Sequence, residues 1–60
     1  MRKLISSGEL AEELGVSTRT IARYAADGLL IPAETTIGGH FRWVLEDVRQ
    51  RMRELRQRDE

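Results

Sequence analysis

The chain contains no cysteine, a single proline, one Trp, one Tyr, one Phe, and no surplus of either charge. Without cysteine, disulfides and thiolate-based metal or redox sites are excluded. The longest apolar run, residues 29–31, is far shorter than the roughly 20 residues that cross a bilayer. The N-terminus lacks the apolar core of a signal peptide, so a cytoplasmic protein is expected. At 60 residues the chain is expected to form one domain, 1–60, too small to enclose an enzyme pocket.

The stretch after Ile5 carries the start and stop signals of a short helix. Ser6 and Glu9 have the spacing of a capping box, in which each side chain accepts the backbone N–H of the other residue. Ile5 and Leu10 have the spacing of a hydrophobic staple. Gly15 is expected to adopt the left-handed conformation that ends the helix. A helix of about eight residues is therefore predicted.

A second short helix is predicted from Ser17 to Gly28. Ser17 is placed to accept the backbone N–H of Thr20 as an N-cap, and Gly28 to end the helix. Its inward face is expected to consist of Ile21, Tyr24 and Ala25. Only Gly15, Val16 and Ser17 separate the two helices, which is typical of a helix-turn-helix.

The middle of the chain has the pattern of a β-hairpin. The segments 33–37 and 40–44 are rich in β-branched and aromatic residues, and Gly38-Gly39 between them predicts a two-residue turn. Phe41 and Trp43 alternate with His40 and Arg42. We therefore expect the aromatic pair to pack on the helices and the basic pair to face outward.

The C-terminal stretch from residue 45 to residue 60 predicts a third helix, whose last residues, 58–60, are expected to fray. Its apolar stripe consists of Leu45, Val48, Met52 and Leu55. The stripe is expected to pack on the first helix, and its end is available to a neighbouring copy. The order helix, tight turn, helix, hairpin and helix predicts a fold that is mainly α with a small β-hairpin, a winged helix-turn-helix.

The zero net charge hides an uneven distribution. The range 9–15 carries only acidic charges, at Glu9, Glu12 and Glu13. Arg19 and Arg23 lie on the outward face of the second helix, together with small alanines. An arginine in the first turn of such a helix can donate two hydrogen bonds to guanine, and a threonine methyl can contact thymine. The helix N-terminus can hold a phosphate, and wing residues can enter the minor groove.

These observations select a set of candidate DNA-binding residues on the second helix and the wing. They are Ser17, Thr18, Arg19, Thr20, Arg23, Tyr24, His40 and Arg42. The lone His40, without cysteines or paired carboxylates, predicts no metal site, and no catalytic residues or cofactor are expected.

Two motifs carry a resemblance to a known family. The pattern Ser6-x-x-Glu9-Leu10-Ala11-x-x-Leu14-Gly15-Val16-Ser17-x-Arg19-Thr20-Ile21-x-Arg23-Tyr24 and the wing Gly38-Gly39-His40-Phe41-Arg42-Trp43 resemble MerR-like and excisionase-like domains. The resemblance covers roughly residues 4–55 and implies binding of double-stranded DNA, with the second helix in the major groove and the wing alongside. It implies a bacterial or phage-encoded, nucleoid-associated protein, similar to phage excisionases or to small regulators of the BldC kind.

The residues leave several functions open. An excisionase, which directs recombination, and a small transcriptional regulator need the same DNA-reading surface. Adjacent copies of the chain and a recombinase are possible partners on DNA. The neutral charge and Phe41 in the wing motivate an alternative, a protein-interaction domain that kept the fold. A further alternative is the DNA-targeting domain of a larger recombinase or regulator.

Overall fold

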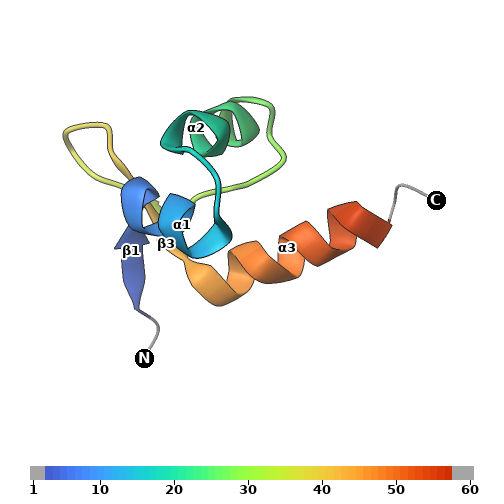
Figure 1. Ribbon diagram of the computed structural model, residues 1–60. Helices are drawn as coiled ribbons and strands as arrows, with labels where there is room; N and C mark the ends of the chain where they lie inside the picture. Colours follow the sequence, from blue (N-terminus) through green and yellow to red (C-terminus); the bar gives the residue numbers. More distant parts are fainter. Residues whose placement is uncertain (1–2, 58–60) are drawn as a thin grey trace.

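The computed structural model describes residues 3–57 (Figure 1). Three helices and a small antiparallel sheet confirm the expected winged helix-turn-helix, mainly α with a hairpin. The elements in chain order are β1 (Leu4–Ser6), α1 (Ser7–Leu14), α2 (Thr18–Ala26), β2 (Glu34–Thr35), β3 (Phe41–Val44) and α3 (Leu45–Gln57). The predicted fraying of residues 58–60 lies outside the described residues.

Helix α1 begins and ends as its sequence predicts. Ser6 is the N-cap, and its hydroxyl oxygen accepts the Glu9 N–H at 3.1 Å while Glu9 Oε1 accepts the Ser6 N–H at 3.1 Å. Gly15 follows in the left-handed conformation, with φ at 72°. The N–H groups of Gly15 and Val16 bond to the last carbonyls of the helix, and Val16 packs half-buried against the core. Both ends of α1 are therefore fixed by local interactions.

Helix α2 follows the same rules. The Ser17 hydroxyl oxygen accepts the Thr20 N–H at 3.1 Å. Gly28 has a φ of 77°, and the Leu29 N–H donates to the Tyr24 carbonyl at 2.9 Å, closing the C-terminus as a Schellman motif. The turn between the helices spans residues 15–17, as a helix-turn-helix requires.

The sheet has the order β1-β3-β2, with both pairs antiparallel. Ile5 lies opposite Trp43 and Thr35 lies opposite Phe41. Strand β1 is not predicted by the sequence pattern, because three residues are too few to show an alternation of period two. These residues are a strand because they pair with β3, which makes β3 the central strand.

The turn of the wing is longer than predicted. Thr36 and His40 form the closing pair, with the Thr36 N–H donating to the His40 carbonyl at 2.8 Å, so the loop is Ile37–Gly39. A two-residue type I′ turn at Gly38-Gly39 needs positive φ at both glycines, but only Gly39 has it, at 85°. The prediction of a two-residue turn was therefore wrong. The loop is a type I turn that ends in a left-handed bulge residue.

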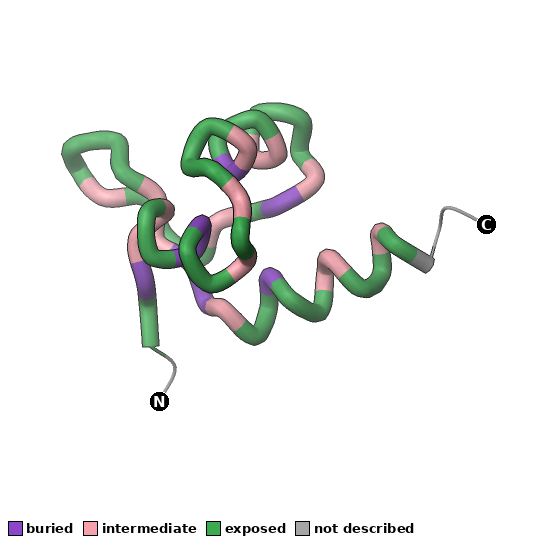
Figure 2. Tube along the Cα trace, in the orientation of Figure 1, coloured by how far each residue is buried: buried purple, intermediate pink, exposed green. Residues whose placement is uncertain are grey.

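The core lies where the helix pair meets the sheet (Figure 2). Its fully buried side chains are Trp43, Leu10, Ile21 and Leu30. The Trp43 indole N–H donates to the Ser7 hydroxyl at 2.9 Å, and Phe41 contacts the Trp43 ring edge-to-face with centroids 5.8 Å apart. The expected inward packing of Phe41 and Trp43 is confirmed, with Phe41 only half-buried.

Helix α3 begins at Leu45, directly after the last residue of β3. Val48 is buried, and Leu45 and Met52 pack against the core cluster that includes Leu10 of α1. Arg51 Nε donates to the Leu29 carbonyl at 3.0 Å, joining α3 to the loop after α2. The far half of α3 extends beyond the body of the domain (Figure 1). Within residues 3–57 no helix is long and apolar enough to cross a membrane.

We expect Ser7→Ala to lower the free energy of unfolding by about 1–2 kcal/mol, because the buried Trp43 indole N–H would lose its acceptor. Chemical denaturation followed by circular dichroism measures the change. Gly8→Ala is the matched control in the same first turn of α1, where the added methyl has room and favours the helix. A Ser7→Ala protein as stable as the wild type would contradict the assigned role of this bond.

The turn geometry makes a second prediction. Gly39→Ala should destabilise the hairpin by about 1–2 kcal/mol, because a left-handed residue with a Cβ is strained. Gly38→Ala should be tolerated, since its Cβ would meet the His40 ring at an ordinary 3.4 Å. Amide hydrogen exchange at Thr36 and His40 reports the local loss. An equal penalty at both glycines would indicate the two-residue turn instead.

Candidate nucleic-acid interface

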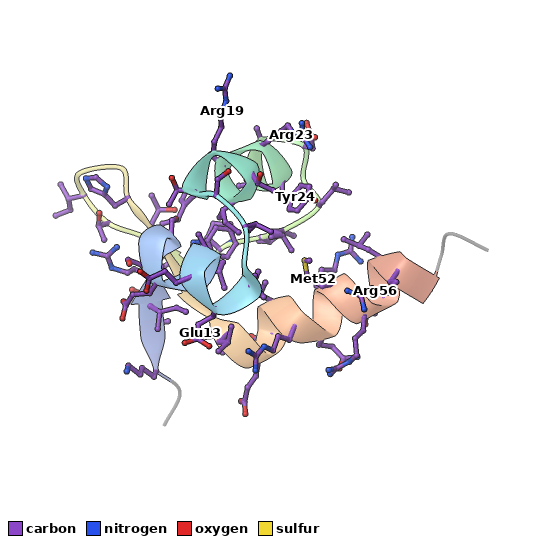
Figure 3. The ribbon with its side chains drawn as sticks, viewed as in Figure 1. Glu13, Arg19, Arg23, Tyr24, Met52 and Arg56 are labelled. Carbon is purple, nitrogen blue, oxygen red and sulfur yellow. The ribbon has the colours of Figure 1, made fainter. Side chains whose placement is uncertain are left out.

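The outer face of α2 presents arginines separated by small residues. Thr18, Arg19, Ala22 and Arg23 are exposed, and Thr20 is half-buried, as the helical spacing predicts. Arg19, Thr20, Ala22 and Arg23 line a shallow hollow on this face. Figure 3 shows the Arg19 side chain pointing away from the body of the domain. This face is therefore a cationic surface. The small Ala22 between the two arginines leaves room for a ligand to approach the helix closely.

The first turn of α2 adds the positive end of the helix dipole to this surface. The N–H groups of Thr18 and Arg19 have no intrahelical acceptor, since they precede the first complete turn. No acidic residue lies in this turn to neutralise them. Ser17 and Thr20 brace the turn, with their hydroxyl oxygens 3.1 Å apart. The start of the helix is thus rigid and suited to an anion.

Arg23 and Tyr24 form the second part of the helix surface. The Arg23 guanidinium carbon lies 6.0 Å from the centroid of the Tyr24 ring, within the range of a cation–π contact. Tyr24 itself is half-buried and packs against the core. Among residues 3–57, no carboxylate lies within ion-pairing distance of Arg19 or Arg23. Both guanidinium groups are therefore available to a ligand.

The two wing candidates differ in their surroundings. His40 is exposed next to the turn, and its backbone N–H donates to Thr36 Oγ1 at 3.1 Å. Arg42 is half-buried in the central strand, and its Nη1 donates to the Phe41 carbonyl at 3.2 Å. Arg42 lies opposite Glu34 in the register of β2 and β3. Alternation along the strand predicts an outward-facing Arg42. In the structure its side chain is nevertheless half-buried, and its guanidinium bonds to the backbone.

The structure thus separates the sequence candidates into groups. One surface on α2 holds Ser17, Thr18, Arg19, Thr20 and Arg23. Tyr24 supports that surface from its inner side, and His40 and Arg42 lie on the wing. Figure 1 shows the wing loop and the N-terminal end of α2 projecting on the same side of the molecule. The structure also places Ile37, which the sequence pattern assigns to a strand segment, fully exposed in this loop.

Three of the acidic residues lie together on a surface formed by elements other than α2. Glu9, Glu13 and Glu46 line a hollow formed by β1, α1 and the start of α3. Glu13 and Arg19 point in opposite directions in Figure 3. Arg49 of α3 pairs with Glu13 at 3.6 Å, so this arginine lies on the acidic side. The outer face of α2 is therefore cationic, whereas Glu9, Glu13 and Glu46 lie on other elements, together with Lys3 and Arg49.

The sequence relationships agree with this geometry. The model of the MerR family regulatory protein matches residues 6–43, from the N-cap of α1 to the buried Trp43. The chain belongs to the MerR family. The match covers the whole helix-turn-helix and the wing as far as Trp43.

A relative with a described role supports the same family. The chain is 47% identical over 49 residues to the nodulation protein NolA of Bradyrhizobium elkanii, and the match covers 82% of this chain. It covers 22% of NolA, so the chain spans about a fifth of that relative's length. No solved structure matches the chain significantly.

The matching family model describes a regulatory protein, and the residues that it matches include the helix-turn-helix and the wing. Among residues 3–57, no group of His, Asp and Glu side chains is arranged to hold a metal ion.

Proposed function

We propose that this chain binds duplex DNA sequence-specifically as a transcriptional regulator, with the first turn of α2 in the major groove and the wing alongside. The observation that carries the proposal is Arg19. It is exposed, has no ion pair among residues 3–57, and projects from a capped first turn in which the N–H groups of Thr18 and Arg19 have no intrahelical acceptor. In helix-turn-helix proteins this is the position from which side chains contact base edges.

Each residue of α2 has a distinct role in the proposal. Arg19 donates two hydrogen bonds to guanine O6 and N7, and the Thr18 methyl contacts a thymine methyl. Ser17, Thr20 and the first N–H groups of the helix hold a backbone phosphate. Arg23 contacts a second phosphate, and the Tyr24 ring 6.0 Å away orients its guanidinium.

The wing and the Tyr24 hydroxyl of α2 make the remaining contacts. His40, exposed beside the turn, contacts the minor groove or its flanking phosphates. Arg42 gives up its bond to the Phe41 carbonyl in order to reach a phosphate. The Tyr24 hydroxyl is a further phosphate donor at the edge of α2.

The regulatory role is supported by the family and by NolA, which is named as a nodulation protein. Since NolA is much longer, the proposal includes the case in which these residues form the DNA-binding part of a longer regulator. The alternative role in recombination, with a recombinase as partner, requires the same surface and differs in the DNA site.

The zero net charge affects the expected affinity for DNA and the interaction between adjacent bound copies. A neutral domain releases few counterions from DNA, so a single copy is expected to bind with modest affinity. Adjacent copies repel each other weakly. We therefore include side-by-side, cooperative occupation of neighbouring sites in the proposal.

The decisive experiment selects bound sequences from a random duplex library and then footprints the protein on its own genomic DNA. Protection over a promoter supports regulation. Protected tandem repeats at an attachment site would replace regulation with the excisionase role. Absence of binding above background at low salt would reject the proposal and favour the protein-interaction alternative.

Arg19→Ala should lower affinity for the selected site by about 1–3 kcal/mol and relax base preference at one position, because a bidentate base contact is lost. Repeating the selection with the variant measures the preference. Arg49→Ala is the matched control, since its guanidinium pairs with Glu13 on the acidic side. Unchanged preference in Arg19→Ala would show that another residue reads that base.

Arg23→Ala should behave differently from Arg19→Ala. Loss of one phosphate contact weakens binding to all sequences equally and reduces the slope of log affinity against log salt by about one. Fluorescence anisotropy titrations at several salt concentrations measure the slope. A variant that changed base preference and kept the wild-type slope would contradict the phosphate role.

A further inference from the structure

The tip of the wing is apolar. Ile37 has a relative exposure of 109%, the highest among the exposed large hydrophobic residues of the described chain. It has no side-chain neighbours in the turn, because Gly38 and Gly39 follow it. Tight turns favour Gly, Asn, Asp, Pro and Ser at such positions, so folding does not require an isoleucine here. The side chain exposes apolar surface to water without any packing to offset it.

Hydrogen bonds of the turn hold the backbone on both sides of Ile37. The Thr36 N–H donates to the His40 carbonyl at 2.8 Å, and the Gly39 N–H donates to the Thr36 carbonyl at 2.9 Å. The His40 N–H adds a bond to Thr36 Oγ1 at 3.1 Å. The tube in Figure 2 is exposed around the whole loop, which projects from the domain. Ile37 therefore stands at the end of a braced, narrow projection.

We propose that Ile37 is an apolar wedge that enters the DNA minor groove, partly unstacks a base step and bends the duplex. This inference rests on the proposed function and extends it to the shape of the bound DNA. In the view of Figure 1 the wing loop and the N-terminal end of α2 project toward the same side, and the proposal has both contact one duplex in adjacent grooves. Proteins that kink DNA insert apolar side chains of this kind from the minor groove.

The geometry of the tip suits that groove. The minor groove is about 6 Å wide, and the two residues that follow Ile37 in the loop are glycines without side chains, so the tip is narrow on that side. The exposed His40 beside the turn then lies next to the groove walls. Ile37 specifies no base by hydrogen bonding, but flexible pyrimidine–purine steps bend at lower cost. The wedge therefore favours such a step under the wing.

The test measures affinity and bend angle on the selected duplex, with the bend taken from fluorescence energy transfer between the DNA ends. Ile37→Ala should bind about tenfold more weakly and lose most of the wild-type bend, because the buried apolar contact is gone. Ile37→Leu, which keeps a wedge, should retain the bend. The matched control is Ile31→Ala, since Ile31 is an isoleucine with 84% exposure in the segment before β2.

Thermal unfolding should be unchanged in Ile37→Ala, because the side chain is fully exposed. A wild-type bend that persists in Ile37→Ala, or a wild-type complex with straight DNA, overturns the wedge while leaving the proposed DNA binding intact. Equal loss of the bend in Ile31→Ala also overturns it. A wild-type protein that binds no duplex at all overturns both proposals.

Discussion

The arrangement of the whole domain depends on the burial of Trp43. This side chain is fully buried in the central strand, and its indole N–H is bonded to Ser7 at the first residue of α1. Burial of a tryptophan contributes about 4–6 kcal/mol, comparable with the total stability of about 3–9 kcal/mol for a domain of this length. Strand β3 continues into the wing at one end and into α3 at the other. By fixing β3 on the helix-turn-helix, Trp43 places both of these elements relative to α2.

Local chemistry explains how much of this fold could be predicted from the sequence. Ser6, Gly15, Ser17 and Gly28 act within a few residues of their own positions, so the helix ends follow from capping rules alone. Strand β1 exists only through its pairing with β3, which no local pattern reveals. The turn length was misjudged because two adjacent glycines suggest a type I′ turn, whereas the pairing of Thr36 with His40 places Ile37 inside the loop.

The same distinction applies to the candidate site. Helical periodicity was enough to place Arg19 and Arg23 on one exposed face, because α2 is a regular helix. The half-burial of Arg42 depends on its having a strand on each side, which required knowledge of β1. The sequence likewise could not show which arginines form ion pairs, because such partners can lie far apart along the chain. Arg49 is paired with Glu13, whereas Arg19 and Arg23 have no carboxylate partner among residues 3–57, so the outer face of α2 is cationic although the net charge of the chain is zero.

The direct passage from β3 into α3 has a mechanical consequence. Since no linker separates Val44 from Leu45, α3 begins where the wing strand ends. The hydrogen bond from Arg51 Nε to the Leu29 carbonyl attaches α3 to the loop after α2 at a second point. Helix α3 is therefore tied both to the wing strand and to the segment that follows the helix-turn-helix.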